Sequence, residues 1–108
     1  MIKIMITTAG QEIRRVDVNG HAGKKRGRDL VCAAVSAVTQ TALSGLLHYR
    51  KEIVKHTTGD GRLCIEISEA PDARTKNIFN TILFTMTLGL KGIEREHPRR
   101  VKVEFVTK

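Results

Sequence analysis

The chain has 108 residues, which predicts one domain that is large enough to form its own core without disulfides or metal. Hydrophobic residues make up 41% of it, which excludes intrinsic disorder, and two cysteines are too few for the disulfide framework of a small secreted protein. The formal net charge of +8 favours anionic partners such as RNA, ribosomes or anionic lipid.

The chain begins with an alternating segment in which Ile2, Ile4 and Ile6 share one face, and this pattern predicts a strand. It lacks the apolar run of a signal peptide. No segment is expected to be long and apolar enough to span a membrane. We therefore expect a soluble, cytoplasmic protein with no membrane partner.

Residues 13–18 predict a second strand, which Asn19-Gly20 ends. Its alternation slips at Arg14-Arg15, which indicates either a bulge or the true start of the strand. Residues 22–28 contain Gly23 and Gly27 and have no apolar period, so we expect an exposed loop that closes over a substrate. The basic residues of this loop are either solvated or in contact with phosphate; they are Lys24, Lys25, Arg26 and Arg28.

A helix is predicted from Leu30 to about Arg50, with Asp29 as its N-cap. The first turns of this helix are apolar nearly all round, which predicts that it is central and buried.

Two more strands are expected at 53–57 and 63–67, joined by a hairpin turn at 58–61. A second helix begins at Pro71-Asp72 and runs to about Glu96, and Pro98 stops it. Its apolar face consists of Ile78, Ile82, Met86, Leu90 and Ile93, widened by Phe79, Leu83 and Phe84. With a closing strand at 101–105, the order is ββαββαβ: an α/β fold of the two-layer α+β kind, with one mixed sheet and two helices in a single domain, 1–108.

Cys32 is the residue that points most directly to chemistry. If Asp29 is the N-cap, Cys32 is the third helical residue, where the helix dipole favours the reactive thiolate. The backbone N–H groups at the same helix start are suited to bind a developing oxyanion. On position alone, Cys32 also fits a small buried hydrophobe.

His21 is the candidate general base for Cys32, because it lies where the second strand ends, just before the loop that leads to the helix. His48 is excluded, since it lies 16 residues further along the same helix, about 24 Å away. His56, His97 and Cys64 fit structural positions.

Asp29 and Ser36 are candidates for contacts that support the pair formed by Cys32 and His21. Asp29 also fits a simple cap, and Ser36 also fits a helix serine that bonds back to a carbonyl. The sequence contains no metal-ligand spacing and no strand–GxGxxG–helix order, so we expect neither a metal site nor a nucleotide site.

The sequence around Cys32 resembles the signature of the ribosomal-processing cysteine protease family, Prp. This signature consists of Gly20-His21-Ala22, a short loop with Gly23 and Gly27, and then the run from Asp29 through Leu30-Val31-Cys32 to Ser36. This resemblance covers essentially the whole chain. It implies a cofactor-free, cytoplasmic, homodimeric thiol protease with a dyad of His21 and Cys32. It also implies a substrate, a large-subunit ribosomal protein precursor that carries a short N-terminal extension.

Two other classes of function remain open at this point. The net charge and the basic loop also suit a non-catalytic RNA- or ribosome-binding domain, and they suit contact of an enzyme with ribosomal RNA. The wide apolar face of the second helix suits a dimerisation module, which leaves His21 and Cys32 unexplained.

Overall fold

The strands predicted from the alternating segments form one five-stranded sheet in the computed structural model, which describes residues 1–20 and 30–108. The strands are β1 (Ile2–Ala9), β2 (Glu12–Asn19), β3 (Val54–Gly59), β4 (Arg62–Ile67) and β5 (Val101–Thr107). Their order across the sheet is β3-β4-β2-β1-β5. Only the β1–β5 pair is parallel and the other pairs are antiparallel, so the expected mixed sheet is confirmed.

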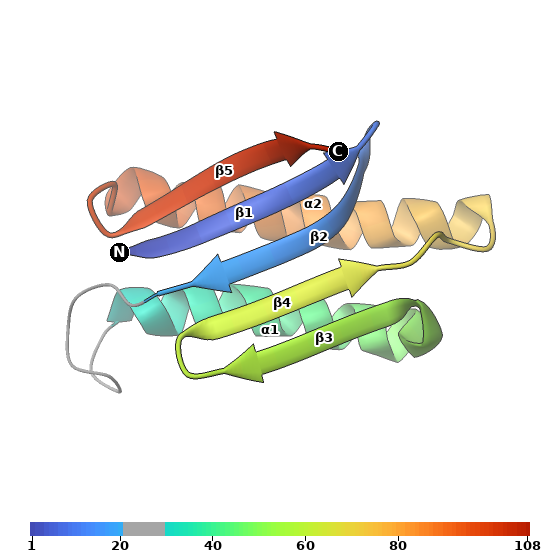
Figure 1. Cartoon of the computed structure of the whole chain (residues 1–108), viewed down its shortest axis with the longest axis horizontal. Helices are drawn as coiled ribbons and strands as arrows, with labels where there is room; N and C mark the ends of the chain where they lie inside the picture. Colours follow the sequence, from blue (N-terminus) through green and yellow to red (C-terminus); the bar gives the residue numbers. More distant parts are fainter. Residues whose placement is uncertain (21–29) are drawn as a thin grey trace.

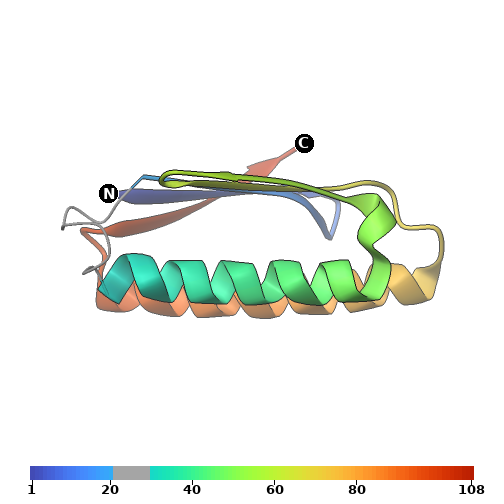
Figure 2. The ribbon, with the colours of Figure 1, turned by 90° about the horizontal axis from the view of Figure 1, so that it is seen from below.

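Two long helices pack on the same face of this sheet, and the opposite face is left open (Figures 1 and 2). They are α1 (Leu30–Arg50) and α2 (Ala73–Glu96), and a short 3-10 turn, η1 (Lys51–Ile53), leads from α1 into β3. The predicted ββαββαβ order is therefore confirmed. A single layer of helices explains the period-two pattern, because alternate strand residues face the helices or solvent.

The core lies between the helices and the sheet. Ile2, Ile4 and Ile6 on β1 are at most 2% exposed, as the alternation predicted. They face Leu46 of α1 and Leu83 of α2 across one continuous apolar cluster. Complete burial of such a side chain contributes roughly 1.5–3 kcal/mol, so this layer contributes much of the stability.

The slip in the second strand is a bulge. Thr7 pairs with Arg15 and Thr8 pairs with Ile13, which leaves Arg14 without a partner in the ladder. The extra residue brings both Ile13 and Val16 to the helix-covered face, where each is buried. The Arg14 guanidinium instead donates to the carbonyl oxygen of Ile67, 3.2 Å away.

The expectation that α1 is buried all round is wrong. Val31, Val35 and Leu46 face the sheet, whereas Leu30 is 84% exposed and Ala33 and Ala37 are not buried. The reason is the single helix layer, which leaves the outer side of α1 uncovered (Figure 2).

The buried side of α2 also differs from the predicted stripe. The helix begins at its N-cap Asp72, whose carboxylate accepts from the Thr75 N–H at 2.7 Å. The side that faces the core consists of Thr75, Phe79, Leu83, Met86, Thr87 and Leu90. Ile82 instead lies at the seam between α2 and α1, close to Gly45, because the apolar arc of α2 is divided between the sheet and the other helix.

Leu30–Ile53, with α1 and η1 together, is long and apolar enough by length and composition to cross a membrane. The expectation that no segment reaches this limit is therefore wrong. In this fold α1 packs lengthwise against the sheet, and the core helix of a soluble protein satisfies the same criterion.

Candidate active site

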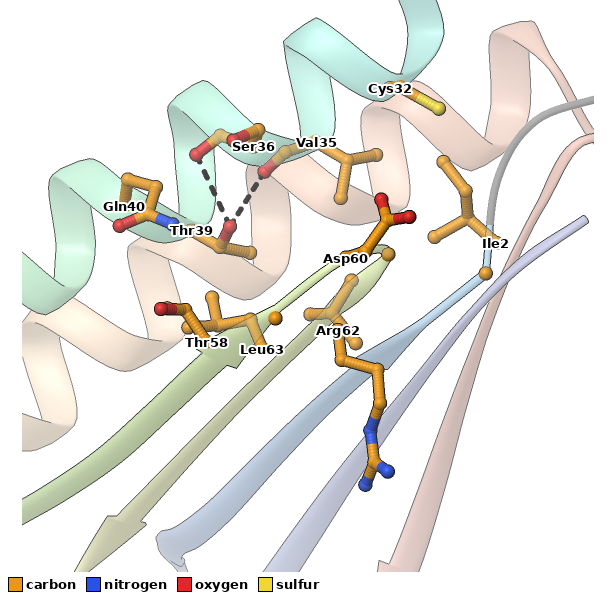
Figure 3. A pocket seen from close by; sticks show the side chains of 14 residues that line it. Ile2, Cys32, Val35, Ser36, Thr39, Gln40, Thr58, Asp60, Arg62 and Leu63 are labelled. Carbon is orange, nitrogen blue, oxygen red and sulfur yellow. Dashed lines mark hydrogen bonds between the residues drawn. The ribbon is translucent and has the colours of Figure 1, made fainter. Parts of the chain in front are cut away.

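Cys32 lies in the first turn of α1 and lines a pocket between this helix and the turn that joins β3 to β4. The α1 side of the pocket continues with Val35, Ser36 and Thr39, which follow Cys32 at helical spacing (Figure 3). Val35 and Thr39 are buried, so they fix this part of the helix against the core. A partly buried sulfur thus lies at the rim of a pocket that a peptide side chain can enter.

The floor of the pocket comes from strands that are distant in the sequence. It contains Ile2 on β1, Val18 at the end of β2 and Leu63 on β4. Ile2 and Leu63 are buried, and together with Val18 they give the pocket an apolar base. An apolar floor beside a nucleophile is suited to hold an apolar side chain near the bond that is cut.

Gly20 is the last described residue before the gap, and it also lines the pocket. Its N–H donates to the carbonyl oxygen of Gly61 at 2.8 Å, which ties the end of β2 to the β3–β4 turn. Its φ angle is +103°, a conformation that favours glycine, and a Cβ atom there would overlap the carbonyl oxygen of Met1. The chain therefore leaves the described part at a fixed point of the pocket.

The other residues predicted for this site lie outside the described residues. They are the proposed base His21, the helix cap Asp29 and the loop positions Ala22, Gly23 and Gly27. The two residues that border this gap do lie near Cys32, because Gly20 lines the same pocket and Leu30 begins α1 two residues before Cys32. The end of β2 and the start of α1 lie at the same end of the molecule (Figure 1).

Ser36 lines the pocket, and within the described residues its hydroxyl makes no hydrogen bond back along the helix. Thr39 does so instead, with its hydroxyl donating to the carbonyl oxygens of Val35 at 2.9 Å and Ser36 at 3.3 Å (Figure 3). The Ser36 side chain is exposed, so it is accessible to a peptide lying in the pocket.

The sequence did not identify the β3–β4 turn as part of the site. Its residues 58–62 line the pocket, and Asp60 directs its carboxylate from the turn towards α1, on the side where Cys32 lies (Figure 3). Arg62 points the other way, along the sheet and away from α1. In the sequence, Thr58-Gly59-Asp60-Gly61 indicates only a hairpin turn, and no local signal shows which helix the turn approaches.

Cys64 is separate from this site, because it faces the helix-free side of the sheet next to Asp17. Burial, together with the hydrogen bond and negative charge of Asp17, raises the pKa of the Cys64 thiol. The Arg15 guanidinium donates to the Asp17 carboxylate at 2.7 Å and is the main reason that the pKa of Asp17 is lowered. A thiol held protonated in this way is a poor nucleophile.

In the described part of the chain, no histidine lines the pocket and no cluster of side chains is suited to bind a metal ion. His48, His56 and His97 do not line it, and His97 forms the C-cap of α2. No group of three or more His, Cys, Asp or Glu side chains within residues 1–20 and 30–108 is arranged to hold a metal ion.

Comparison with known proteins gives one family and one fold. The family model described as cysteine protease Prp matches residues 1–102. A crystal structure of an essential ribosomal processing protease Prp from S. aureus, in complex with a covalently linked product peptide, matches with a TM-score of 0.83 at 26% identity, covering 97% of this chain and 99% of that one. The same protein in complex with a substrate peptide matches with a TM-score of 0.81 at 25% identity, over the same shares of the two chains.

A further structure, SMU.848 from Streptococcus mutans, shares the fold at 20% identity with a TM-score of 0.78, covering 100% of this chain and 96% of that one. The comparison with curated proteins found no match.

Proposed function

This chain belongs to the Prp family of cysteine proteases, and from that premise we propose that it removes a short N-terminal extension from a precursor of a large-subunit ribosomal protein. Cys32 is the nucleophile and His21 is the general base and acid. The observation that carries the proposal is the position of Cys32, in the first turn of α1 at the rim of a pocket with an apolar floor. The S. aureus structures with substrate and product peptides support the same class of reaction.

In the proposed reaction, His21 takes the proton of the Cys32 thiol and the sulfur attacks the carbonyl carbon of the scissile peptide bond. A C–S bond forms, and the negative charge that develops on the carbonyl oxygen is stabilised at the N-terminal end of α1. The C–N bond then breaks as His21 gives its proton to the leaving amine. Water hydrolyses the thioester, which frees Cys32 and leaves a carboxylate on the extension.

The pairing of His21 with Cys32 is supported by the position of Gly20. This residue immediately precedes His21, lines the pocket that contains Cys32 and is fixed there by its hydrogen bond to Gly61. Asp29 and Ser36 assist the dyad in this proposal. The loop from Ala22 through Gly23 to Gly27 covers the bound peptide.

The assembly and location of the enzyme are also part of the proposal. It acts as a homodimer in the cytoplasm without a cofactor. The net charge of +8 supports a contact with ribosomal RNA in addition to the protein substrate. The same charge favours the second candidate function, a non-catalytic RNA- or ribosome-binding domain.

The test is incubation of the purified protein with the extended ribosomal protein precursor, followed by mass spectrometry. We expect a single cut that releases the extension. Cys32→Ser is expected to abolish cleavage, and His21→Ala is expected to lower its rate by about 10²–10⁴-fold. Cys64→Ser is the matched control and should cleave like wild type, because Cys64 lies on the other face of the sheet.

Two results would contradict this proposal. Turnover at the wild-type rate by Cys32→Ser would exclude Cys32 as the nucleophile. An intact precursor after long incubation with folded wild-type protein would favour the non-catalytic binding domain.

A further inference from the structure

Three cations form a row across the open face of the sheet. Lys102 on β5 lies directly beside Lys3 on β1, Lys3 pairs with Asn19 on β2, and Asn19 pairs with Arg62 on β4. The two neighbours of Lys3 in β1, Ile2 and Ile4, are buried under the helices, so Lys3 faces the helix-free side. We refer to Lys3, Lys102 and Arg62 as the basic row.

The basic row brings like charges together without compensating contacts. Lys3 and Lys102 occupy directly opposed positions, an arrangement that destabilises a sheet. In the part of the chain that the structure describes, none of the three takes part in an ion pair. The charges of Arg62 and Lys102 help to lower the pKa of Asp17 and Glu94, respectively, although neither forms an ion pair with that carboxylate.

The remainder of the open face is organised differently. Glu104 and Asp17 lie in the next row, and Arg15 pairs with Asp17 at 2.7 Å and with Glu66 at 3.4 Å. Positive charge without a paired acid is therefore concentrated at one end of the sheet. Arg99 and Arg100 immediately precede β5 at the same end, but Arg100 lies on the helix side, where it lines a pocket with Leu30 and His97.

We propose that the basic row binds the phosphate backbone of RNA. Adjacent strands lie about 4.8 Å apart, so the row presents cations at intervals that a flexible phosphate chain can follow. Met5, in the next row, is a large apolar side chain on this face, and the basic row itself contains no aromatic residue on which a base could stack. Recognition is therefore electrostatic and independent of base sequence.

A membrane surface is the less suitable partner for the same charge. A protein that lies on a membrane inserts a group of apolar side chains beside its cations, whereas the neighbouring positions on this face combine Met5 with the acidic side chains of Asp17 and Glu104. The row also belongs to a β-sheet and not to an amphipathic helix.

The position of the row leaves the pocket open. Lys3 follows Ile2 and Asn19 precedes Gly20, and both of those neighbours line the pocket that contains Cys32. The row and the pocket therefore share one end of the sheet. Arg62 borders both, but its guanidinium points away from α1 and from the side on which Cys32 lies (Figure 3). RNA bound to the row would hold the pocket beside a peptide that emerges from a ribosomal assembly. This inference deepens the proposed ribosomal role and rests on it for its biological meaning.

The experiment compares two double variants of equal charge. Lys3→Gln/Lys102→Gln removes two cations of the row, and Lys55→Gln/Lys108→Gln removes two exposed lysines from β3 and the C-terminal residue, away from the row. Binding of a labelled single-stranded RNA of mixed sequence is measured by fluorescence anisotropy over a range of salt concentrations. Cleavage of a short synthetic peptide with the cut-site sequence is measured in parallel.

For the row variant we expect weaker RNA binding, on the order of tenfold at low salt, and a salt slope smaller by about 1.4, or 0.7 for each phosphate that a lysine no longer neutralises. The control variant should bind nearly as wild type does. Peptide cleavage should be unchanged in both, which separates RNA binding from catalysis. The melting temperature of the row variant should be equal or higher, because a like-charge pair has been removed.

Equal loss of RNA affinity in both double variants would overturn the proposal, since net charge and not the row would then be responsible. A wild-type protein that binds anionic lipid vesicles through these lysines but does not bind RNA would overturn it as well. If only the row variant loses RNA affinity but the wild-type protein does not cut the peptide, the proposed protease function fails and the RNA site stands.

Discussion

Cys64 on β4 lies directly opposite Asp17 on β2, and its thiol interacts with the Asp17 carboxylate on the helix-free face of the sheet. This pairing separates the two cysteines by chemical environment. Cys32 lies at the start of a helix beside a pocket, whereas the pKa of Cys64 is raised, first by burial and then by Asp17.

From this difference we predict that iodoacetamide labels Cys32 faster than Cys64 at neutral pH. Peptide mapping after short exposures measures the two rates. Asp17→Asn should accelerate labelling of Cys64 by up to about tenfold for each unit by which the pKa falls, because removal of the carboxylate charge lowers the pKa and raises the thiolate fraction. Labelling of Cys32 serves as the internal control, and faster labelling of Cys64 in wild type would contradict the assignment of Cys32.

Gly20 and Gly10 form a matched pair for testing how the chain enters the site. Both have positive φ angles, but a Cβ atom at Gly10 meets nothing within 4 Å, whereas at Gly20 it would overlap the Met1 carbonyl oxygen. Gly10→Ala should cost about 1 kcal/mol from backbone conformation alone, and Gly20→Ala should cost more, roughly 2–3 kcal/mol.

The cleavage activity of Gly20→Ala and Gly10→Ala shows whether the substitution at Gly20 acts on the site or only on the stability of the fold. Gly20→Ala should also lower kcat for precursor cleavage under conditions where both variants are folded, because Gly20 fixes the chain one residue before His21. Urea unfolding gives the stabilities, and the precursor assay gives kcat. Equal kcat values for the two variants would show that the geometry at Gly20 is not needed for cleavage.

Glu94 connects the end of α2 to β5 and should make stability depend on pH. Its carboxylate accepts from the Val103 N–H at 2.8 Å and contacts Lys91 at 3.0 Å, and these interactions lower its pKa, the bond to Val103 most of all. A carboxyl group whose pKa is lower in the folded state stabilises the fold above its unfolded pKa of about 4.3, and this contribution is lost as the pH falls through the folded value.

Glu94→Gln should therefore reduce the free energy of unfolding by about 1 kcal/mol at neutral pH, and by less in acid. Urea titrations across the acidic range measure this change. Glu96→Gln is the control, because Glu96 is exposed and takes part in no ion pair within the described residues. A reduction that stays constant from neutral pH to acid would show that the charge of Glu94 is not responsible.

The outer side of the helix layer carries the surface on which we expect a second copy of the chain to bind. A groove between α1 and α2 is lined mainly by small and apolar side chains, namely Ala37, Val38, Thr41, Ala42, Gly45, Thr81, Ile82, Thr85, Met86 and Gly89. Phe84 and Leu88, beside it on α2, are each more than half exposed. Contiguous apolar surface of this kind usually forms an interface.

Light scattering of the wild type at micromolar concentration should therefore give the mass of a dimer. Thr85→Arg should convert it to a monomer, because a bulky cation in the groove prevents close contact of two apolar surfaces. Thr57→Arg places the same side chain at an exposed position on β3 and should remain dimeric. A dimeric Thr85→Arg variant would place the interface elsewhere.

The sequence by itself predicted the elements closely. The alternation of Ile2, Ile4 and Ile6, the turn at 58–61 and the helix start at Pro71-Asp72 are local patterns, and local backbone preferences decide where strands, turns and helices begin and end. The Cys32 motif was recognisable for the same reason, since its residues are close together in the chain.

Only the tertiary structure decided which surfaces are covered and which distant segments meet. Residues such as Leu30 and Ala37 are apolar whether or not another layer covers them, so hydropathy could not reveal that the outer side of α1 is open. Asp60 reaches the pocket, and Lys3 lies beside Lys102, through strand order and register. These are set by long-range pairing of segments that have no proximity in the sequence, and local patterns carry no information about such pairing.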